Sequence, residues 1–257
     1  MIRYSWIAAT ALLMFLAPRL ETRAAEVPDF IAAAVADANR PDADRQRDAN
    51  RKPAQTLVFA GVRPGEQIAE LMPGGGYFTR IFSKAVGESG HIYALVPAPL
   101  ATAAADAPDF SARIKAIAKD PHYGNVSVVV EPFSQLNVPA PVDLVWTSQN
   151  YHDLHNFPGI DLTVFNQMVF AALKPGGIYL ILDHAAAAGS GIRDTKTLHR
   201  IDAEAVKREV LAAGFVFDGP SGLLKNADDP HTAPVFDPEI RGKTDQFILK
   251  FHKPAQK

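Results

Sequence analysis

Residues 66–97 read EQIAELMPGGGYFTRIFSKAVGESGHIYALVP, and this stretch decides the fold. An apolar run over residues 68–72 breaks at a proline and three glycines, and residues 77–86 then carry apolar side chains at helical spacing. A turn over residues 87–90 leads into a second apolar, β-rich run at 92–96. The order strand, glycine turn, helix, strand predicts one βαβ unit.

The glycine turn predicts a binding site for a nucleotide-like ligand. Gly74, Gly75 and Gly76 allow the backbone to turn tightly and to approach a ligand, and the N-terminus of the following helix favours polar or anionic groups. The dinucleotide fingerprint G-x-G-x-x-G fails at its third glycine, where Thr79 stands, so a nicotinamide dinucleotide is disfavoured. A tight turn without any ligand is the alternative.

The motif over residues 70–76 resembles the acidic-x-Gly-x-Gly-x-Gly motif of class I S-adenosylmethionine (SAM)-dependent methyltransferases, with Met72 in place of the first glycine. Asp143-Leu-Val and the run Leu-Lys-Pro-Gly-Gly at 173–177 also resemble family features, and the resemblance covers roughly residues 54–252. More narrowly, the chain is similar to a family of predicted exported bacterial methyltransferases. It shares with them Glu-x-x-Pro-Gly-Gly-Gly-Tyr, Asn-Tyr-His-Asp and Leu-His-Arg-Ile-Asp.

Strands and helices are expected to alternate along the rest of the chain, which predicts an α/β fold with a doubly wound parallel sheet. Further strands are expected at 126–130 (a buried strand), 141–147, 178–183, from 215 and at 246–252, and helices at 28–39, 53–60, 110–119, 160–173 and 203–213. The resemblance implies a Rossmann-like methyltransferase sheet of seven strands, the last antiparallel, in a three-layer αβα arrangement.

Composition agrees with one globular domain. The chain has 257 residues, of which 47% are hydrophobic and 21% charged, with a net charge of −2. Near-neutral charge gives no case for nucleic acid as a partner. The absence of cysteine fits an exported bacterial protein without disulfides.

The first 25 residues differ from the rest and are typical of a secretory signal peptide. Arg3 precedes an apolar run of about a dozen residues, and small residues precede Glu26. Cleavage would leave a single methyltransferase-like domain at 26–257, with residues 26–60 as a helical cap and no stable membrane span. The expected location is periplasmic or secreted, or cytoplasmic if the segment is not a working signal.

Residues 40–52 are dense in mixed charge. The preferred interpretation is a solvated helical surface stabilised by ion pairs between neighbouring turns. The alternative is a cap over the ligand site from which Arg47 or Arg51 reaches an acidic group.

The resemblance implies a set of cofactor-binding residues: Glu70, Pro73, Gly74, Gly75, Gly76 and Tyr77 around the turn, and Glu131 with Phe133 near the adenine. Val96 stands where family members usually carry the acid that binds the ribose hydroxyls. The loss of such a charged contact costs about 1.5–3 kcal/mol per hydrogen bond, so Val96 argues against SAM binding unless another residue supplies the acceptor.

The polar cluster at residues 150–155 (Asn-Tyr-His-Asp-Leu-His) follows the predicted fourth strand, and ligands of open α/β sheets bind at the carboxyl ends of strands. His152 is predicted to be a general base, oriented by Asp153 and assisted by Asn150. Tyr151, His155, His184, His199 and Arg200 are expected to face the substrate. Helix capping without chemistry is the alternative for the cluster.

The leading hypothesis is SAM-dependent methyl transfer to a small-molecule acceptor. The competing hypothesis is a non-catalytic periplasmic ligand-binding protein on the same fold. A third is a metal site formed by His152, His155, His184 and His199 with Asp153 and Asp183, which is disfavoured because no strong zinc spacing such as H-E-x-x-H occurs.

Overall fold

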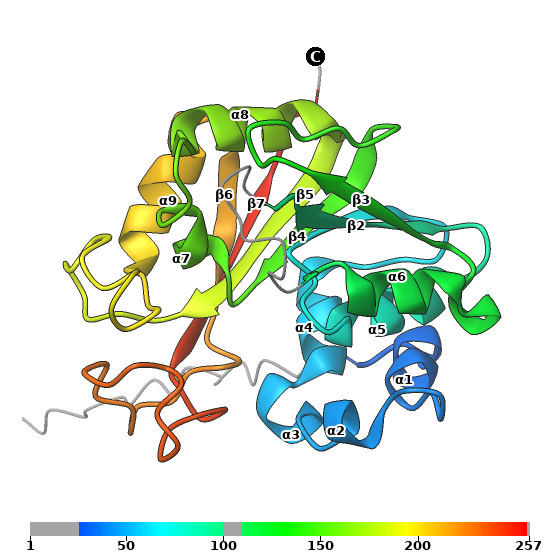
Figure 1. Ribbon diagram of the computed structural model, residues 1–257, viewed down its shortest axis with the longest axis horizontal. Helices are drawn as coiled ribbons and strands as arrows, with labels where there is room; N and C mark the ends of the chain where they lie inside the picture. The colour runs from blue at the N-terminus through cyan, green and yellow to red at the C-terminus, as the bar shows by residue number, and fades with distance from the viewer. Residues whose placement is uncertain (1–25, 100–108, 256–257) are drawn as a thin grey trace, which may run out of the picture.

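A computed structural model describes residues 26–99 and 109–255, which form a seven-stranded sheet in the order β3-β2-β1-β4-β5-β7-β6 (Figure 1). The strands are β1 (Gln67–Leu71), β2 (His91–Pro97), β3 (Val126–Glu131), β4 (Val142–Ser148), β5 (Leu173–His184), β6 (Val216–Ser221) and β7 (Gln246–His252). Strand β7 is antiparallel to both of its neighbours, β5 and β6. The predicted Rossmann-like methyltransferase sheet is therefore confirmed.

Helices cover both faces of the sheet and complete the three layers. One face carries α1 (Asp29–Val35), α4 (Pro53–Ala60), α5 (Tyr77–Val86) and α6 (Ala112–Lys119), and the other carries α7 (Tyr151–Leu154), α8 (Leu162–Ala172) and α9 (Ala203–Ala212). The short helices α2 (Asp42–Arg45) and α3 (Asp48–Arg51) belong to the N-terminal segment next to α4, and the 3-10 helix η1 (Pro121–Tyr123) follows α6 (Figure 1).

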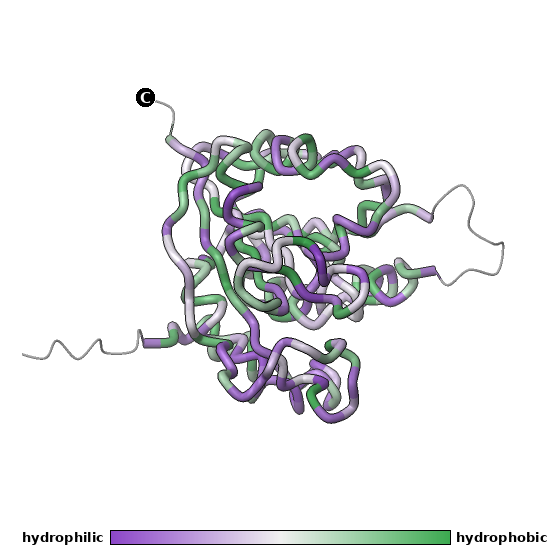
Figure 2. The backbone as a smooth tube through the Cα atoms, turned by 90° about the vertical axis from the view of Figure 1, so that its left-hand side faces the viewer, coloured by the Kyte–Doolittle hydropathy of each residue, from purple (hydrophilic) through white to green (hydrophobic). Residues whose placement is uncertain are grey.

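The strands divide their side chains between two cores because successive residues point to opposite faces. Ile68 of β1 packs on the side of α5, whereas Ala69 and Leu71 pack on the side of α8 and α9. Figure 2 shows this contrast along the chain, with mostly hydrophobic colours through the packed layers and mostly hydrophilic colours in the loops at the bottom of the view.

Two local predictions were wrong. Strand β3 was expected to be buried, but it lies at the edge of the sheet and Val130 is 40% exposed. A run of β-branched residues favours a strand without fixing its place in the sheet. Residues 174–177 were expected to be a turn before the fifth strand. They instead lie within β5, where pairing with β4 shifts from Val142–Leu173 to Leu144–Ile178.

The predicted signal peptide, residues 1–25, lies outside the described residues. Helices α1–α4 occupy the segment expected to form an N-terminal cap. Within residues 26–99 and 109–255, none of the helices combines the length and the apolar character that crossing a membrane requires.

Candidate functional site

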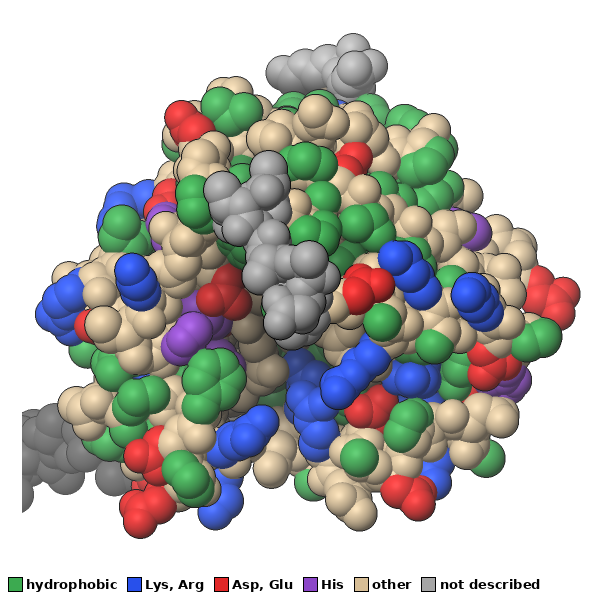
Figure 3. Space-filling model, viewed as in Figure 1, with side chains coloured by type: hydrophobic (Ala, Val, Ile, Leu, Met, Phe, Trp, Pro, Cys, Tyr) green, Lys and Arg blue, Asp and Glu red, His purple; other side chains and the backbone are tan. Residues whose placement is uncertain are grey.

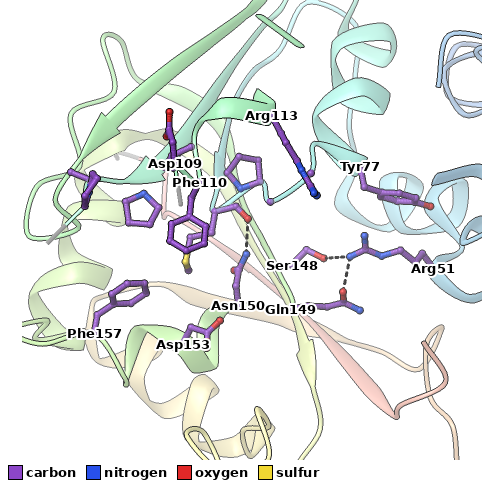
Figure 4. Close-up of a pocket in the computed structure, with 18 of the residues that line it drawn as sticks. Arg51, Tyr77, Asp109, Phe110, Arg113, Ser148, Gln149, Asn150, Asp153 and Phe157 are labelled. Atoms are coloured by element: carbon purple, nitrogen blue, oxygen red, sulfur yellow. Dashed lines mark hydrogen bonds between the residues drawn. The ribbon is translucent and has the colours of Figure 1, made fainter. Parts of the chain in front are cut away.

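A cavity of about 870 Å³ opens at the carboxyl ends of β1, β2 and β4 (Figure 4). Its lining includes Pro73–Gly75 after β1, Val96 and Pro97 at the end of β2, and Ser148 at the end of β4. This volume is within the range of small-molecule and cofactor sites, about 300–1,000 Å³. Sequence position and sheet topology together therefore place a ligand-sized cavity at the glycine turn.

The glycine turn is held in left-handed backbone conformations. Gly74 and Gly76 have φ of 58° and 80°, and Met72, in place of the family's first glycine, has φ of 49°. Asn150 Nδ2 donates hydrogen bonds to the carbonyl oxygens of Met72 (2.9 Å) and Leu71 (3.3 Å), which fixes the start of the turn. The structure thus places Asn150 in a positioning role at the cavity wall.

Glu70 lies behind the turn and not in the cavity lining. Its side chain is buried and accepts a hydrogen bond from Thr79 Oγ1 at 2.5 Å, which ties β1 to the first turns of α5. Burial raises the pKa of Glu70 to about 7, although the Thr79 hydrogen bond and the positive charge of Arg51 oppose the rise. Gly76 is likewise behind the cavity, packed against Ile117 of α6.

The preferred interpretation of residues 40–52 as a solvated surface holds for most of the segment, which is exposed, but not for Arg40 and Arg51. The Arg40 side chain is fully buried and makes two hydrogen bonds to Asp48, at 2.7 and 2.8 Å. Arg51 donates hydrogen bonds to Ser148 Oγ (3.1 Å) and Gln149 Oε1 (2.9 Å) across the cavity floor (Figure 4). The charge pattern of the segment could not show that Arg51 is partly buried, because its hydrogen-bond partners Ser148 and Gln149 lie at the distant end of β4.

Arg51 also stacks on aromatic rings. Its guanidinium carbon lies 4.4 Å from the ring centroid of Tyr77 and 5.0 Å from that of Phe78. Tyr77, a predicted cofactor residue, lines the cavity and donates its hydroxyl to Asp48 at 2.5 Å. Burial lowers the pKa of Arg51 to about 10, with a further contribution from Arg47, and the side chain remains a cation at neutral pH.

The end of β2 presents no acid, as the sequence indicates, but a carboxylate reaches the cavity from the segment before α6. Asp109, Phe110 and Arg113 all line the cavity, and Phe110 is 72% exposed there (Figure 4). Hydrogen bonds from the Ser111 side chain and backbone lower the pKa of Asp109, so its carboxylate is ionised at neutral pH.

Two residues implied for adenine binding lie outside the cavity lining. The Glu131 carboxylate accepts hydrogen bonds from the backbone nitrogen and Nδ2 of Asn137, at 2.6 and 2.8 Å. Phe133 is buried and packs edge-on against Phe157, with ring centroids 5.8 Å apart. Phe157 itself lines the cavity, so Phe133 supports the wall from behind.

His152 is 2% exposed and lies between two carboxylates. Its Nδ1 is 2.8 Å from Asp183 Oδ1, and its Nε2 is 3.3 Å from Asp153 Oδ1. Burial lowers the pKa of His152, but the charge of Asp183 and the two carboxylate partners outweigh this effect and raise the pKa to about 10. The geometry therefore does not favour the predicted general-base role, since both ring nitrogens face carboxylates.

Asp153, and not His152, faces the cavity. Its side chain is 36% exposed and belongs to the cavity lining. Burial opposes ionisation, but His152 and His199 beside it lower the pKa of Asp153.

The predicted substrate residues separate into three environments. Tyr151 is fully buried and donates its hydroxyl to Glu209 of α9 at 2.9 Å, and His155 Nε2 lies 3.3 Å from the same carboxylate oxygen. Arg200 is fully buried and makes two hydrogen bonds to Asp229, at 2.8 and 3.0 Å.

His184 and His199 lie nearer to the site. His184 Nδ1 pairs with Thr244 Oγ1 at 2.8 Å, and burial lowers the pKa of His184 to about 4. His199 Nδ1 lies 3.5 Å from Asp153 Oδ1, so the histidine joins the His152–Asp153 pair at the edge of the cavity.

Several lining residues were not predicted: Asp109, Phe110, Arg113, Ser148, Gln149 and Phe157. Ser148 and Gln149 directly follow the predicted fourth strand, so the rule that ligands bind at strand ends was sufficient to find them. No local sequence signal marks Asp109 to Arg113, because only tertiary folding brings α6 to the cavity.

Comparisons with known proteins agree with the fold. No protein-family model matches the chain, and no curated protein matches its sequence. Among solved structures, a SAM-dependent methyltransferase from Aquifex aeolicus aligns with a TM-score of 0.57 at 16% identity, covering 86% of this chain and 97% of that one.

Two further solved structures show the range of proteins with this fold. The [4+2]-cyclase SpnF aligns with a TM-score of 0.59 at 17% identity, covering 88% of this chain and 92% of that one. The glycopeptide N-methyltransferase MtfA complexed with sinefungin aligns with a TM-score of 0.54 at 16% identity, covering 81% and 87%. These likenesses show that the chain has the fold of class I methyltransferases.

Proposed function

We propose that this protein binds SAM in the cavity and transfers its methyl group to a small-molecule acceptor. One observation carries the proposal: the glycine turn after β1 and the partly buried cation Arg51 border the same cavity at the strand ends. The fold, shared with SAM-dependent methyltransferases and with a sinefungin complex, supports it.

Arg51 is the proposed partner of the amino-acid carboxylate of SAM. It lies beside the glycine turn, where that end of the cofactor is expected. Ser148 and Gln149 fix its guanidinium, and the Tyr77 ring covers one face. A fixed, partly desolvated cation binds a carboxylate more strongly than a solvated one does.

Asp109 is the proposed acceptor for the ribose hydroxyls, in place of the acid that Val96 replaces. It reaches the cavity from the segment that follows β2, although not from the strand itself. Phe110, next to it, offers an exposed aromatic face on which the adenine would stack. Asp109 would thus supply the acceptor that is missing where Val96 stands.

The acceptor is proposed to bind on the side of Asp153, which presents a carboxylate oxygen to the cavity. Methyl transfer from a sulfonium is a direct displacement, so the protein contributes mainly by positioning the two reactants. His152 then acts as a positioning residue behind Asp153.

A second reading is binding without methyl transfer. The [4+2]-cyclase with this fold is also a catalyst, so it shows only that a shared fold does not fix the reaction. Formation of S-adenosylhomocysteine with an acceptor present separates the two readings.

Export by residues 1–25 is part of the proposal, and the mature N-terminus, determined by mass spectrometry, tests for cleavage near Ala24 or Ala25.

The test is calorimetric titration of the full chain with SAM and with S-adenosylhomocysteine. We expect binding that Gly75→Asp abolishes and that Asp109→Asn weakens about 10-fold, the effect of one charged hydrogen bond. Asp218→Asn, at an exposed carboxylate of β6, is the matched control and leaves binding unchanged. A folded protein that binds neither compound would refute the proposal.

A further inference from the structure

Two histidine nitrogens converge on one carboxylate oxygen at the edge of the cavity. His152 Nε2 lies 3.3 Å and His199 Nδ1 lies 3.5 Å from Asp153 Oδ1. The ligand atoms of the three residues all lie within 4.8 Å of one another. Both separations are longer than the usual N–H···O hydrogen bond of about 2.7–3.2 Å.

We propose that His152, Asp153 and His199 bind a divalent transition-metal ion such as Zn²⁺. Two imidazole nitrogens and a carboxylate oxygen are ligands that such ions prefer. A tetrahedral ion with bonds of about 2.1 Å holds its ligands about 3.4 Å apart, close to both separations seen here. His155 and His184, which the sequence suggested as partners, do not belong to this set.

The surroundings of His152 are those of a metal-binding histidine. Its Nδ1 pairs with Asp183 Oδ1 at 2.8 Å, which directs Nε2 toward the other two ligands. A carboxylate on the second ring nitrogen orients a metal-bound imidazole and increases its basicity. Asp183 is fully buried and also accepts hydrogen bonds from the backbone nitrogens of His152 and His184, both at 2.8 Å.

His199 is held in a backbone conformation that is uncommon for residues other than glycine. Its φ is 55°, in the left-handed region, and its ring packs against Phe236 with centroids 4.8 Å apart. The buried pair between the adjacent Arg200 and Asp229 fixes the backbone next to it. Strain of this kind persists where the surrounding structure imposes it and is common at functional sites.

The cluster is accessible from the cavity. Asp153 lines it, and the side chain of His199 is 33% exposed. Figure 3 shows histidine and acidic side chains together on one side of the hollow, with basic side chains on the other. Three protein ligands leave the remaining coordination positions for water or a ligand oxygen. If the proposed methyl transfer holds, an acceptor oxygen would occupy one of them, so this last step depends on that function.

The test is titration of the metal-stripped full chain with Co²⁺, followed by visible absorption, and displacement of Co²⁺ by Zn²⁺. We expect one equivalent to bind with a d–d spectrum. His199→Gly removes one ligand while glycine accepts the local φ, and Asp153→Asn removes the charged oxygen. Each should weaken binding more than Asp183→Asn, for which loss of the orienting partner predicts about 10–100-fold.

His252→Ala is the matched control, because His252 is 33% exposed, like His199, and also lies beside a single carboxylate, Asp218. It should leave Co²⁺ binding unchanged. A folded protein that takes up no stoichiometric Co²⁺, or a His199→Gly variant that binds as the parent does, would overturn the metal site. SAM titration is a separate measurement, so metal binding without SAM binding rejects only the proposed function.

Discussion

The Asp183 carboxylate contacts His152 through both of its oxygens, one at the imidazole ring and one at the backbone. Oδ1 lies 2.8 Å from His152 Nδ1, and Oδ2 accepts a hydrogen bond from the His152 backbone nitrogen at 2.8 Å. Asp183 lies at the end of β5, and His152 lies in α7, directly after the neighbouring strand β4. The pairing of two parallel strands therefore sets the orientation of a side chain at the edge of the cavity.

Replacing Asp183 by asparagine should lower the free energy of unfolding by about 2–4 kcal/mol, because a buried charged partner is lost. Urea denaturation measures the change. Asp218→Asn, at the exposed pair with His252, should cost less than about 1 kcal/mol. Equal effects from both substitutions would contradict a structural role for the buried pair.

Because of Glu70, the free energy of unfolding should fall as pH rises from about 4.5 to about 7. Its pKa is about 7, above the ordinary 4.5, so the folded state holds a proton that the unfolded state releases earlier. Its contribution is fully present below pH 4.5 and is lost as pH rises through 7. The difference in the free energy of unfolding between Glu70→Gln and the parent should therefore shift in favour of the variant by about 2–3 kcal/mol between pH 5 and pH 8. Denaturation at both values tests the difference, and parallel curves would argue against a raised pKa.

Substitution of Gly76 should lower stability, whereas substitution of Gly75 should lower SAM binding and leave stability unchanged. A Cβ on Gly76 would lie 2.2 Å from Ile117 Cδ1 at a φ of 80°, so Gly76→Ala should cost about 2–4 kcal/mol of stability. A Cβ on Gly75 meets only Arg113 Nη1, at 3.8 Å. Gly75→Asp should therefore fold normally and lose SAM. Thermal melts and calorimetry separate the two effects, and an unfolded Gly75→Asp protein would show that the turn tolerates no side chain.

Arg51→Lys should weaken SAM binding about 10-fold, because lysine cannot make two directed hydrogen bonds and stack on a ring at once. Arg47→Lys is the matched control. Arg47 also lines the cavity, but its side chain is 51% exposed, and its paired oxygen on Asp44 lies 3.9 Å away. It should change affinity by less than about 3-fold, since exposed ion pairs contribute little. Equal losses from both variants would indicate that charge alone matters.

The cap shows what residue patterns miss. The sequence placed a helix at residues 53–60, where α4 (Pro53–Ala60) forms, yet the preferred interpretation assigned the charged residues before it to solvent. Arg51 packs against Tyr77 and Phe78 of α5. It donates hydrogen bonds to Ser148 and Gln149, nearly a hundred positions later in the chain. Local charge spacing carries no information on such distant partners.

The sequence by itself determined the sheet, the glycine turn and the polar strand ends. Hydrophobic periodicity and glycine conformations are local properties, and the alternation of strands and helices restricts the topology to few solutions. Only the tertiary structure decided which polar residues face the cavity. In the folded chain Asp109 and Arg51 line the cavity, whereas Glu70 and Arg200 are buried away from it. His199 lies beside His152 and Asp153. Burial and pairing of charges depend on distances between segments far apart in the chain, and those distances are set when the layers pack.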